Sequence, residues 1–311
     1  MPGDARRAAA RPPSPDVTQR LRAARGFVLD LDGTLVLGDS RNHQLAPLPG
    51  ALGLTRWLTQ RHVPFVVLTN GTTRTPRHYA QTLREIGFDI ADDAVLTPAT
   101  SAARLFQRRG HRRVMALGNN GLAGPLRDAG LDVVAPDDQA RAGRAGADAV
   151  LVGWYPDFSM PALEAACRSV WAGAMLYSSS QSLFFASADG KALGTSRAIS
   201  AMIKSITGCR VQLVGKPSLH ALRCAASRLG VPLRDVAVVG DDPDLEVPMA
   251  HRGGALAIAV STGVGAADSF GHLPAARAPH LNVAGVDELL AICRRVGGSA
   301  RVGGSARVHG G

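Results

Sequence analysis

Residues 27–35 read Phe27-Val28-Leu29-Asp30-Leu31-Asp32-Gly33-Thr34-Leu35. The apolar start of this stretch is typical of a buried parallel strand, and two aspartates follow at its carboxyl end. Because residues i and i+2 of a strand share a face, we expect the side chains of Asp30 and Asp32 to point the same way. Two adjacent carboxylates repel each other unless a cation lies between them or one is protonated. The stretch therefore predicts a divalent metal site, an acid–base pair or both, although an ordinary strand that ends in an Asp-Gly turn also fits its spacing.

Further apolar segments along the chain also end in polar residues. Between these segments lie helical patterns, and this alternation predicts a Rossmann-like α/β fold, a parallel sheet with helices on both faces. The carboxyl ends of parallel strands line one edge of a sheet, where ligands bind, so we expect the polar residues to meet there. The predicted strands 64–69, 211–214 and 236–239 lead into Thr69-Asn70-Gly71, Lys216 and Asp241-Asp242, respectively, and 255–260 is the last strand expected.

The middle of the chain interrupts this order with an alternation of its own. Strands are expected at 113–117, 150–152 and 175–178, with helices between them. We therefore predict an inserted α/β cap domain at 96–192, well placed to act as a lid, and a discontinuous core domain at 26–95 and 193–294. Residues 1–25, with clustered prolines, and 295–311, with a repeated Arg-Val-Gly-Gly-Ser-Ala, are predicted to be a disordered basic arm and a disordered Gly-rich tail.

Charge and hydropathy exclude several classes of function. Most of the formal net charge of +10 comes from arginines near the two ends of the chain, and only 5% of residues are aromatic. Nucleic acid is therefore not expected as the main partner. No apolar run reaches the roughly 20 residues of a membrane helix, and no secretory signal is visible, so we predict a cytoplasmic protein without a membrane partner.

Taken together, the polar strand ends resemble a known family. Asp30-x-Asp32-Gly-Thr, Thr69-Asn70, Lys216 and Gly240-Asp241-Asp242 are similar, in this order, to the four motifs of the haloacid dehalogenase (HAD) superfamily. An insertion between the second and third motifs, with Thr69-Asn70-Gly71 and Gly215-Lys216-Pro217, resembles the NagD and para-nitrophenylphosphatase group. The resemblance covers about residues 26–290, so only the two ends of the chain lie outside it.

The resemblance implies a Mg²⁺-dependent phosphatase, an enzyme that hydrolyses a small phosphate monoester such as a sugar phosphate or a nucleotide. It implies that Asp30 is the nucleophile, forming an aspartyl-phosphate, and that Asp32 is the general acid and base. Thr69, Asn70, Gly71 and Lys216 would bind the phosphate, with Lys216 offsetting its charge. Asp30, the backbone carbonyl of Asp32, and Asp241 would hold Mg²⁺, and Asp242 and Glu246 would lie in a second layer around the metal.

Two loops of the expected cap depart from the family pattern. Ser179-Ser180-Gln181-Ser182 stands where relatives commonly have Thr-Asn-Pro-Asp, and Trp154-Tyr155-Pro156-Asp157 where they often carry an Asp near Tyr155. Because the cap influences substrate choice in this group, these departures concern the substrate rather than the reaction. Phosphotransfer to another hydroxyl, as in a mutase, and a binding or regulatory protein with weak catalysis remain alternatives. A homo-oligomer also remains open.

Overall fold

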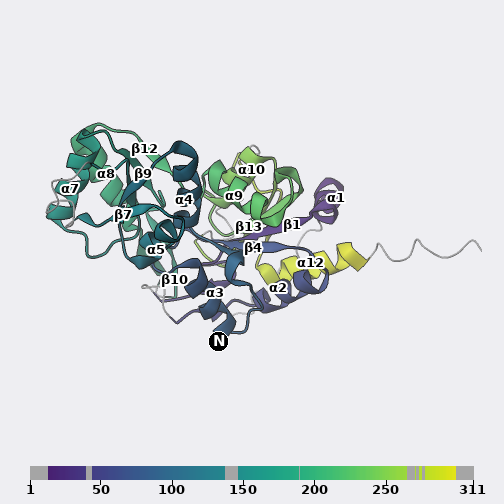
Figure 1. Ribbon diagram of the computed structural model, residues 1–311. Helices are drawn as coiled ribbons and strands as arrows, with labels where there is room; N and C mark the ends of the chain where they lie inside the picture. Colours follow the sequence, from purple (N-terminus) through teal and green to yellow (C-terminus); the bar gives the residue numbers. More distant parts are fainter. Residues whose placement is uncertain are drawn as a thin grey trace, which may run out of the picture.

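The computed structural model describes residues 13–39, 44–136, 146–188, 190–264, 270, 273–274 and 277–298. Two separate parallel sheets organise them, and Figure 1 shows the two groups of strands with their helices as distinct lobes. The larger, six-stranded sheet has the order β15-β14-β13-β1-β4-β5. Its strands are β1 (Gly26–Leu29), β4 (Phe65–Leu68), β5 (Val95–Leu96), β13 (Val236–Gly240), β14 (Leu256–Val260) and β15 (Leu281–Val283).

Helices cover both faces of the larger sheet, because its central strands are apolar on both sides. In β1, Phe27 and Leu29 belong to one core layer, whereas Val28 belongs to the other, as the alternation of side chains along a strand requires. The first layer is covered by α1 (Pro15–Ala23), α2 (Ala51–Gln60), α3 (Pro76–Glu85) and α12 (Val286–Gly298). The second is covered by α9 (Leu219–Leu229) and α10 (Glu246–Gly253).

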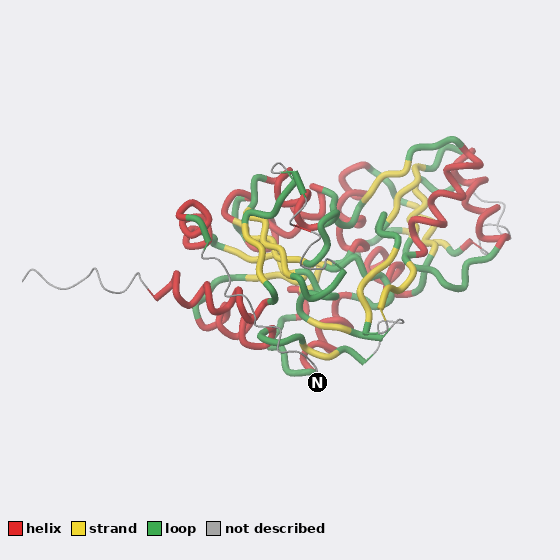
Figure 2. The backbone as a smooth tube through the Cα atoms, turned by 180° about the vertical axis from the view of Figure 1, so that it is seen from behind, coloured by secondary structure: helices red, strands yellow, loops and turns green. Residues whose placement is uncertain are grey.

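The smaller sheet has five strands in the order β12-β9-β8-β6-β7. Figure 2 shows its strands as a separate yellow group beside those of the larger sheet. These strands are β6 (Arg113–Leu117), β7 (Asp132–Val134), β8 (Ala149–Val152), β9 (Met175–Ser178) and β12 (Val211–Leu213). Helices α4 (Pro98–Arg109) and α5 (Asn120–Asp128) pack on one face, and α7 (Met160–Trp171) and α8 (Thr195–Thr207) on the other. The predicted α/β fold, a Rossmann-like core with an added α/β lobe, is confirmed.

One predicted strand lies in the other sheet. The sequence predicts residues 211–214 as part of the core sheet, but β12 pairs with β9 at the edge of the smaller sheet. The sequence of a three-residue strand does not indicate which sheet the strand joins, because this depends on the strands available for pairing in the folded protein. The division at residue 192 stays a prediction, and we propose that the inserted domain extends to about residue 213.

Both ends of the fold contain more structure than predicted. The prediction of a disordered arm at 1–25 is wrong for residues 15–23, which form α1 and bury Val17 and Leu21. Pro15 begins this helix instead of blocking it. The N–H groups of the first turn have no hydrogen-bond partner within the helix, so the N–H that proline lacks costs no helical hydrogen bond. Helix α12 continues to Gly298, and β15 follows the strand expected to be the last. Residues 1–12 and 299–311 lie outside the described residues.

Two short antiparallel pairs stand beside the parallel sheets. One is formed by β2 (Val36–Leu37) and β3 (Ala46–Pro47), the other by β10 (Phe184–Ser187) and β11 (Gly190–Leu193). The hairpin β10–β11 reaches the larger lobe, where the Ala188 N–H donates to the Gly38 carbonyl at 2.6 Å. Across the described part of the chain, no helix has the length and apolar character needed to cross a membrane.

Candidate active site

Asp30 lies directly after β1, at the carboxyl end of a central strand. Its side chain is only 6% exposed, and the Thr34 hydroxyl lies 3.3 Å from its Oδ2 atom and 3.5 Å from Oδ1 of Asp241. Gly33 has a φ of 85°, and a Cβ there would lie 2.6 Å from Oδ2 of Asp241. Only glycine allows both this backbone conformation and this close approach, so the turn after β1 brings Asp30 and Asp241 together.

Lys216 lies at the centre of the acidic group, between Asp30 and Glu246. Its Nζ forms ion pairs with Oδ1 of Asp30 and, at 2.6 Å, with Oε1 of Glu246. All three side chains are buried. Burial works against the charge of the amine, but the two carboxylates outweigh it and raise the pKa of Lys216 above its ordinary value. The lysine is therefore held as a cation next to the predicted nucleophile.

Asp241 follows β13, the strand beside β1. Its Oδ2 accepts a hydrogen bond from the Val264 N–H at 2.6 Å. Burial, followed by the charges of Asp30 and Glu246, raises the pKa of Asp241 well above its usual range. One carboxylate oxygen from each of Asp30, Asp241 and Glu246 lies within 4.8 Å of the others. A buried group of three acids with one amine is short of positive charge, and the pKa of Asp241 reflects that shortage.

The chemistry of this donor set fits a hard divalent cation. Carboxylate oxygens are the ligands that Mg²⁺ and Ca²⁺ prefer, and a bound cation would supply the charge that the acids lack. Glu246 is committed to Lys216, and its other oxygen accepts from the Asp242 N–H at 3.1 Å. The buried acidic cluster can thus hold a metal ion. Its candidate ligands are Asp241, which forms no ion pair with the amine among the described contacts, and the Oδ2 atom of Asp30, whose Oδ1 atom pairs with Lys216.

Asp32 differs from Asp30 in its contacts, since the Lys216 amine pairs with Asp30 whereas the Thr69 hydroxyl lies beside Asp32. Burial, followed by the charge of Asp30, raises the pKa of Asp32 to about 7, a value at which both protonation states are populated near neutral pH. Its Oδ2 lies 3.5 Å from the Thr69 hydroxyl. That hydroxyl also accepts from the Gly71 N–H at 2.8 Å, so Thr69 connects the loop after β4 to Asp32.

Asn70 holds the backbone of Lys216 through its side chain. Its Oδ1 accepts from the Lys216 N–H at 2.7 Å, and its Nδ2 donates to the Lys216 carbonyl at 3.0 Å and to Ser180 Oγ at 3.3 Å. Gly215 allows this fit, since a Cβ there would lie 2.4 Å from Oδ1 of Asn70. The sequence predicts a phosphate-binding role for Asn70, and the side-chain contacts add a link between the two lobes.

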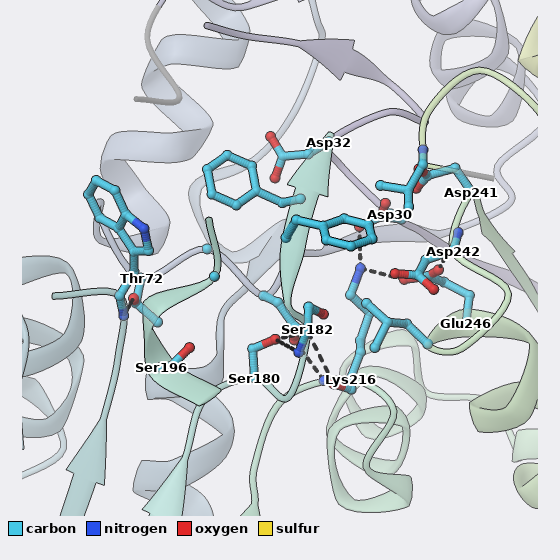
Figure 3. A pocket seen from close by; sticks show the side chains of 18 of the residues that line it. Asp30, Asp32, Thr72, Ser180, Ser182, Ser196, Lys216, Asp241, Asp242 and Glu246 are labelled. Carbon is cyan, nitrogen blue, oxygen red and sulfur yellow. Dashed lines mark hydrogen bonds and ion pairs between the residues drawn. The ribbon is translucent and has the colours of Figure 1, made fainter. Parts of the chain in front are cut away.

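These residues line one cavity of about 100 Å³ at the junction of the lobes (Figure 3). Of the predicted site residues, all but Thr69 line it, and Thr69 contacts the lining residue Asp32. The lining ones are Asp30, Asp32, Asn70, Gly71, Lys216, Asp241, Asp242 and Glu246. Sequence reasoning assigned no role to several other residues around it. The sequence signal for part of this lining was the pair Phe184-Phe185, which follows several serines. The lining without a predicted role includes Thr72, Thr73, Trp154, Ser180, Ser182, Phe184, Phe185, Ser196, Leu245 and Val264.

Comparison with known proteins agrees with this geometry. A model of the haloacid dehalogenase-like hydrolases matches residues 27–132, and a HAD-hydrolase-like model matches residues 213–289. An acid sugar phosphatase of Staphylococcus haemolyticus is 30% identical over 241 residues, which are 77% of this chain and 86% of that protein. The chain belongs to the haloacid dehalogenase-like hydrolases.

Solved structures narrow the position within the family. A 4-nitrophenylphosphatase from Thermotoga maritima has 26% identity and a TM-score of 0.76, over 88% of this chain and 98% of that one. NagD from Escherichia coli, 23% identical with a TM-score of 0.73, covers 85% of this chain and 98% of its own and shares the fold. The predicted NagD and para-nitrophenylphosphatase group is confirmed.

Proposed function

We propose that this chain is a Mg²⁺-dependent phosphatase that hydrolyses a small phosphate monoester, such as a sugar phosphate or a nucleotide. The observation that carries the proposal is the meeting of Asp30, Lys216 and Asp241, which come from three distant parts of the sequence, in one buried cavity. The relatives named acid sugar phosphatase and 4-nitrophenylphosphatase support the same class of substrate. Cytoplasmic location and homo-oligomerisation stay predictions from the sequence.

The proposed reaction consists of two successive displacements at phosphorus. A carboxylate oxygen of Asp30 attacks the phosphorus, the ester P–O bond breaks, and the Asp32 carboxyl gives its proton to the leaving oxygen. The Asp32 carboxylate then takes a proton from water, whose oxygen attacks the aspartyl-phosphate, releasing inorganic phosphate and restoring Asp30. Thr69, Asn70 and Gly71 would position the phosphate, while the charge of Lys216 offsets the negative charge of the transferring group.

Asp30, Asp241 and the backbone carbonyl of Asp32 would hold Mg²⁺. When bound, the ion supplies positive charge that lessens the repulsion between the Asp30 carboxylate and the phosphate. Asp242 and Glu246 would act around this group, Glu246 through its ion pair with Lys216.

The test is the substitution Asp30→Asn, measured on para-nitrophenyl phosphate with Mg²⁺ and again with EDTA. Because an amide is a poor nucleophile, we expect kcat to fall by at least about 10³-fold with an unchanged circular dichroism spectrum. Asp89→Asn, at an exposed aspartate far from the cavity, is the matched control. Retained activity in Asp30→Asn, or full activity in EDTA, would overturn the proposal. Phosphate found on a second alcohol instead of free in solution would indicate a phosphotransferase.

A further inference from the structure

The cavity has two chemically different sides. Figure 3 shows Asp241, Asp242 and Glu246 together on one side, and Ser180, Ser182 and Ser196 away from them. Aromatic side chains of Trp154, Phe184 and Phe185 line the same cavity. We define these six residues of the smaller lobe and its hairpin as the aromatic wall.

Hydrogen bonds hold the aromatic wall in place at both ends. The Trp154 indole N–H donates to the Leu193 carbonyl at 3.1 Å, so the ring is fixed to strand β11. The backbone N–H of Trp154 donates to the Thr72 hydroxyl at 2.9 Å, which connects the wall to the loop after β4. At the tip of the hairpin, Ala188 is bound to Gly38. The wall therefore stands at a defined position relative to Asp30.

The charge of the lining disfavours a second anion on the substrate. The described residues that line the cavity include five acids, Asp30, Asp32, Asp241, Asp242 and Glu246, and one cation, Lys216. Lys216 is already paired with two of these acids. No described residue of the aromatic wall carries a cation. The start of α8 at Thr195 contributes only the partial positive charge of a helix end, which suits an uncharged oxygen and falls short of pairing a full charge.

One hydroxyl of the wall has a place for a ligand. The Oγ atom of Ser182 is buried and has no hydrogen-bond partner among the described residues. Buried polar groups are normally paired, so an unpaired hydroxyl in a binding cavity indicates a partner that arrives with the substrate. Aromatic rings next to it offer flat apolar surface for a ring.

We propose that the aromatic wall is the binding site for the leaving group, and that it selects an uncharged, ring-bearing alcohol and rejects one with a second anionic group. Sugars, nucleosides and phenols share this chemistry. The inference rests on the proposed phosphatase function and adds a substrate class to it.

The experiment compares 3-(hydroxymethyl)phenyl phosphate with 3-carboxyphenyl phosphate, whose leaving groups have similar basicity and differ in charge. Acetyl phosphate, which has no ring and whose acetate leaving group needs no proton from Asp32, reports on attack by Asp30 without the aromatic wall. We expect kcat/KM to favour the neutral aryl ester by at least about 10-fold, since the carboxylate would be buried without a partner. Phe184→Ala should raise KM for the neutral ester more than for acetyl phosphate.

Two variants at one position separate charge from packing. Ser182→Lys should improve kcat/KM for the carboxylated ester relative to the neutral one by about 10-fold, because it adds a cation to the wall. Ser182→Ala, the matched control, should keep the preference for the neutral ester. Equal use of both esters by the wild type, with acetyl phosphate hydrolysed in an Asp30-dependent way, would overturn this inference alone. Failure to hydrolyse any of the three would overturn the phosphatase function and the inference together.

Discussion

At the scale of single residues, the position of Lys216 depends on contacts at both ends of the residue. Its amine is bound by Asp30 and Glu246, and its backbone N–H and carbonyl are both bound by the Asn70 side chain. An amine that must meet a transferring phosphoryl group gains from such restraint, because a displacement of about 1 Å can cost roughly 100-fold in rate. Asn70 is thus a positioning residue that acts through Lys216.

The substitution Asn70→Ala removes both hydrogen bonds to the Lys216 backbone but keeps the backbone N–H of residue 70. We expect kcat to fall by about 10- to 100-fold while KM changes little, because the lysine loses its position but the phosphate keeps its backbone contacts. Steady-state kinetics on para-nitrophenyl phosphate separate the two constants.

Ser180→Ala is the comparison variant, since it removes the Asn70 Nδ2 and Ser182 N–H contacts to Ser180 Oγ but keeps both hydrogen bonds from Asn70 to the Lys216 backbone. We expect its effect on kcat to be much smaller. Equal losses of kcat in the two variants, or a change confined to KM in Asn70→Ala, would show that Asn70 does not act through Lys216.

The sequence predicts much of the site because its motifs follow strands. Asp30 and Asp241 come after neighbouring parallel strands, so they are expected to meet at one edge of the sheet without any knowledge of side-chain packing. The pairing of Glu246 with Lys216 and the hold of Asn70 on Lys216 depend on the tertiary arrangement of separate segments. No local pattern encodes those contacts.

At the scale of secondary structure elements, interior strands of the smaller sheet were predicted closely, whereas its edge strand β12 and the hairpin β10–β11 were not. The strands at 113–117 and 175–178 have the predicted bounds. The hairpin β10–β11 was not expected, and β12 was expected in the other sheet. An edge strand or a hairpin gains its stability from the partner it pairs with, and the sequence of one strand does not specify that partner.

Helix α1 allows a test of the corrected view of the first residues. It packs against α12 and β14, and Leu21 is 6% exposed. We expect Leu21→Ala to lower the free energy of unfolding by about 2 to 5 kcal/mol, because it removes buried methyl groups and leaves a cavity. Urea unfolding followed by circular dichroism measures the change.

Gln19→Ala, on the exposed side of the same helix, is the control, and we expect it to stay within about 0.5 kcal/mol of the wild type. If Leu21→Ala changes the free energy of unfolding no more than Gln19→Ala does, α1 does not contribute to the core in solution.

At the scale of the whole molecule, the site exists only where the two lobes meet. The larger lobe supplies Asp30 and Asp241, and Lys216 follows the edge strand of the smaller sheet. Contacts such as the 3.0 Å hydrogen bond from Asn119 Nδ2 to the Thr73 carbonyl connect the lobes beside the cavity. Because acids, amine and aromatic wall come from different lobes, the relative position of the lobes affects catalysis and substrate choice together.

The stability of the molecule should also depend on pH through His280, which lies away from the active site. Its Nδ1 accepts a hydrogen bond from the Ala257 N–H at 2.9 Å, and its ring centre lies 4.6 Å from that of His251. Burial, followed by the charge of Arg20 and the neighbouring His251, lowers the pKa of His280 to about 4, against the opposing charge of Asp16. Between pH 6.5 and about 4 the unfolded chain binds a proton there that the folded chain does not. The contribution of His280 is therefore fully present above about pH 6.5 and is lost as the pH falls through that range.

We expect His280→Asn to reduce the loss of unfolding free energy between about pH 7.5 and pH 5, measured by urea denaturation at each pH. The comparison with wild type is needed because the raised pKa values of Asp32 and Asp241 act in the opposite direction, favouring the folded state at low pH. His78→Asn, at an exposed histidine of α3, should leave the wild-type difference unchanged. If His280→Asn and His78→Asn keep the same pH dependence as the wild type, the neutral histidine between β14 and β15 does not influence folding. A reduced dependence in His280→Asn alone would instead assign part of the acid sensitivity of the larger lobe to this one hydrogen-bonded ring.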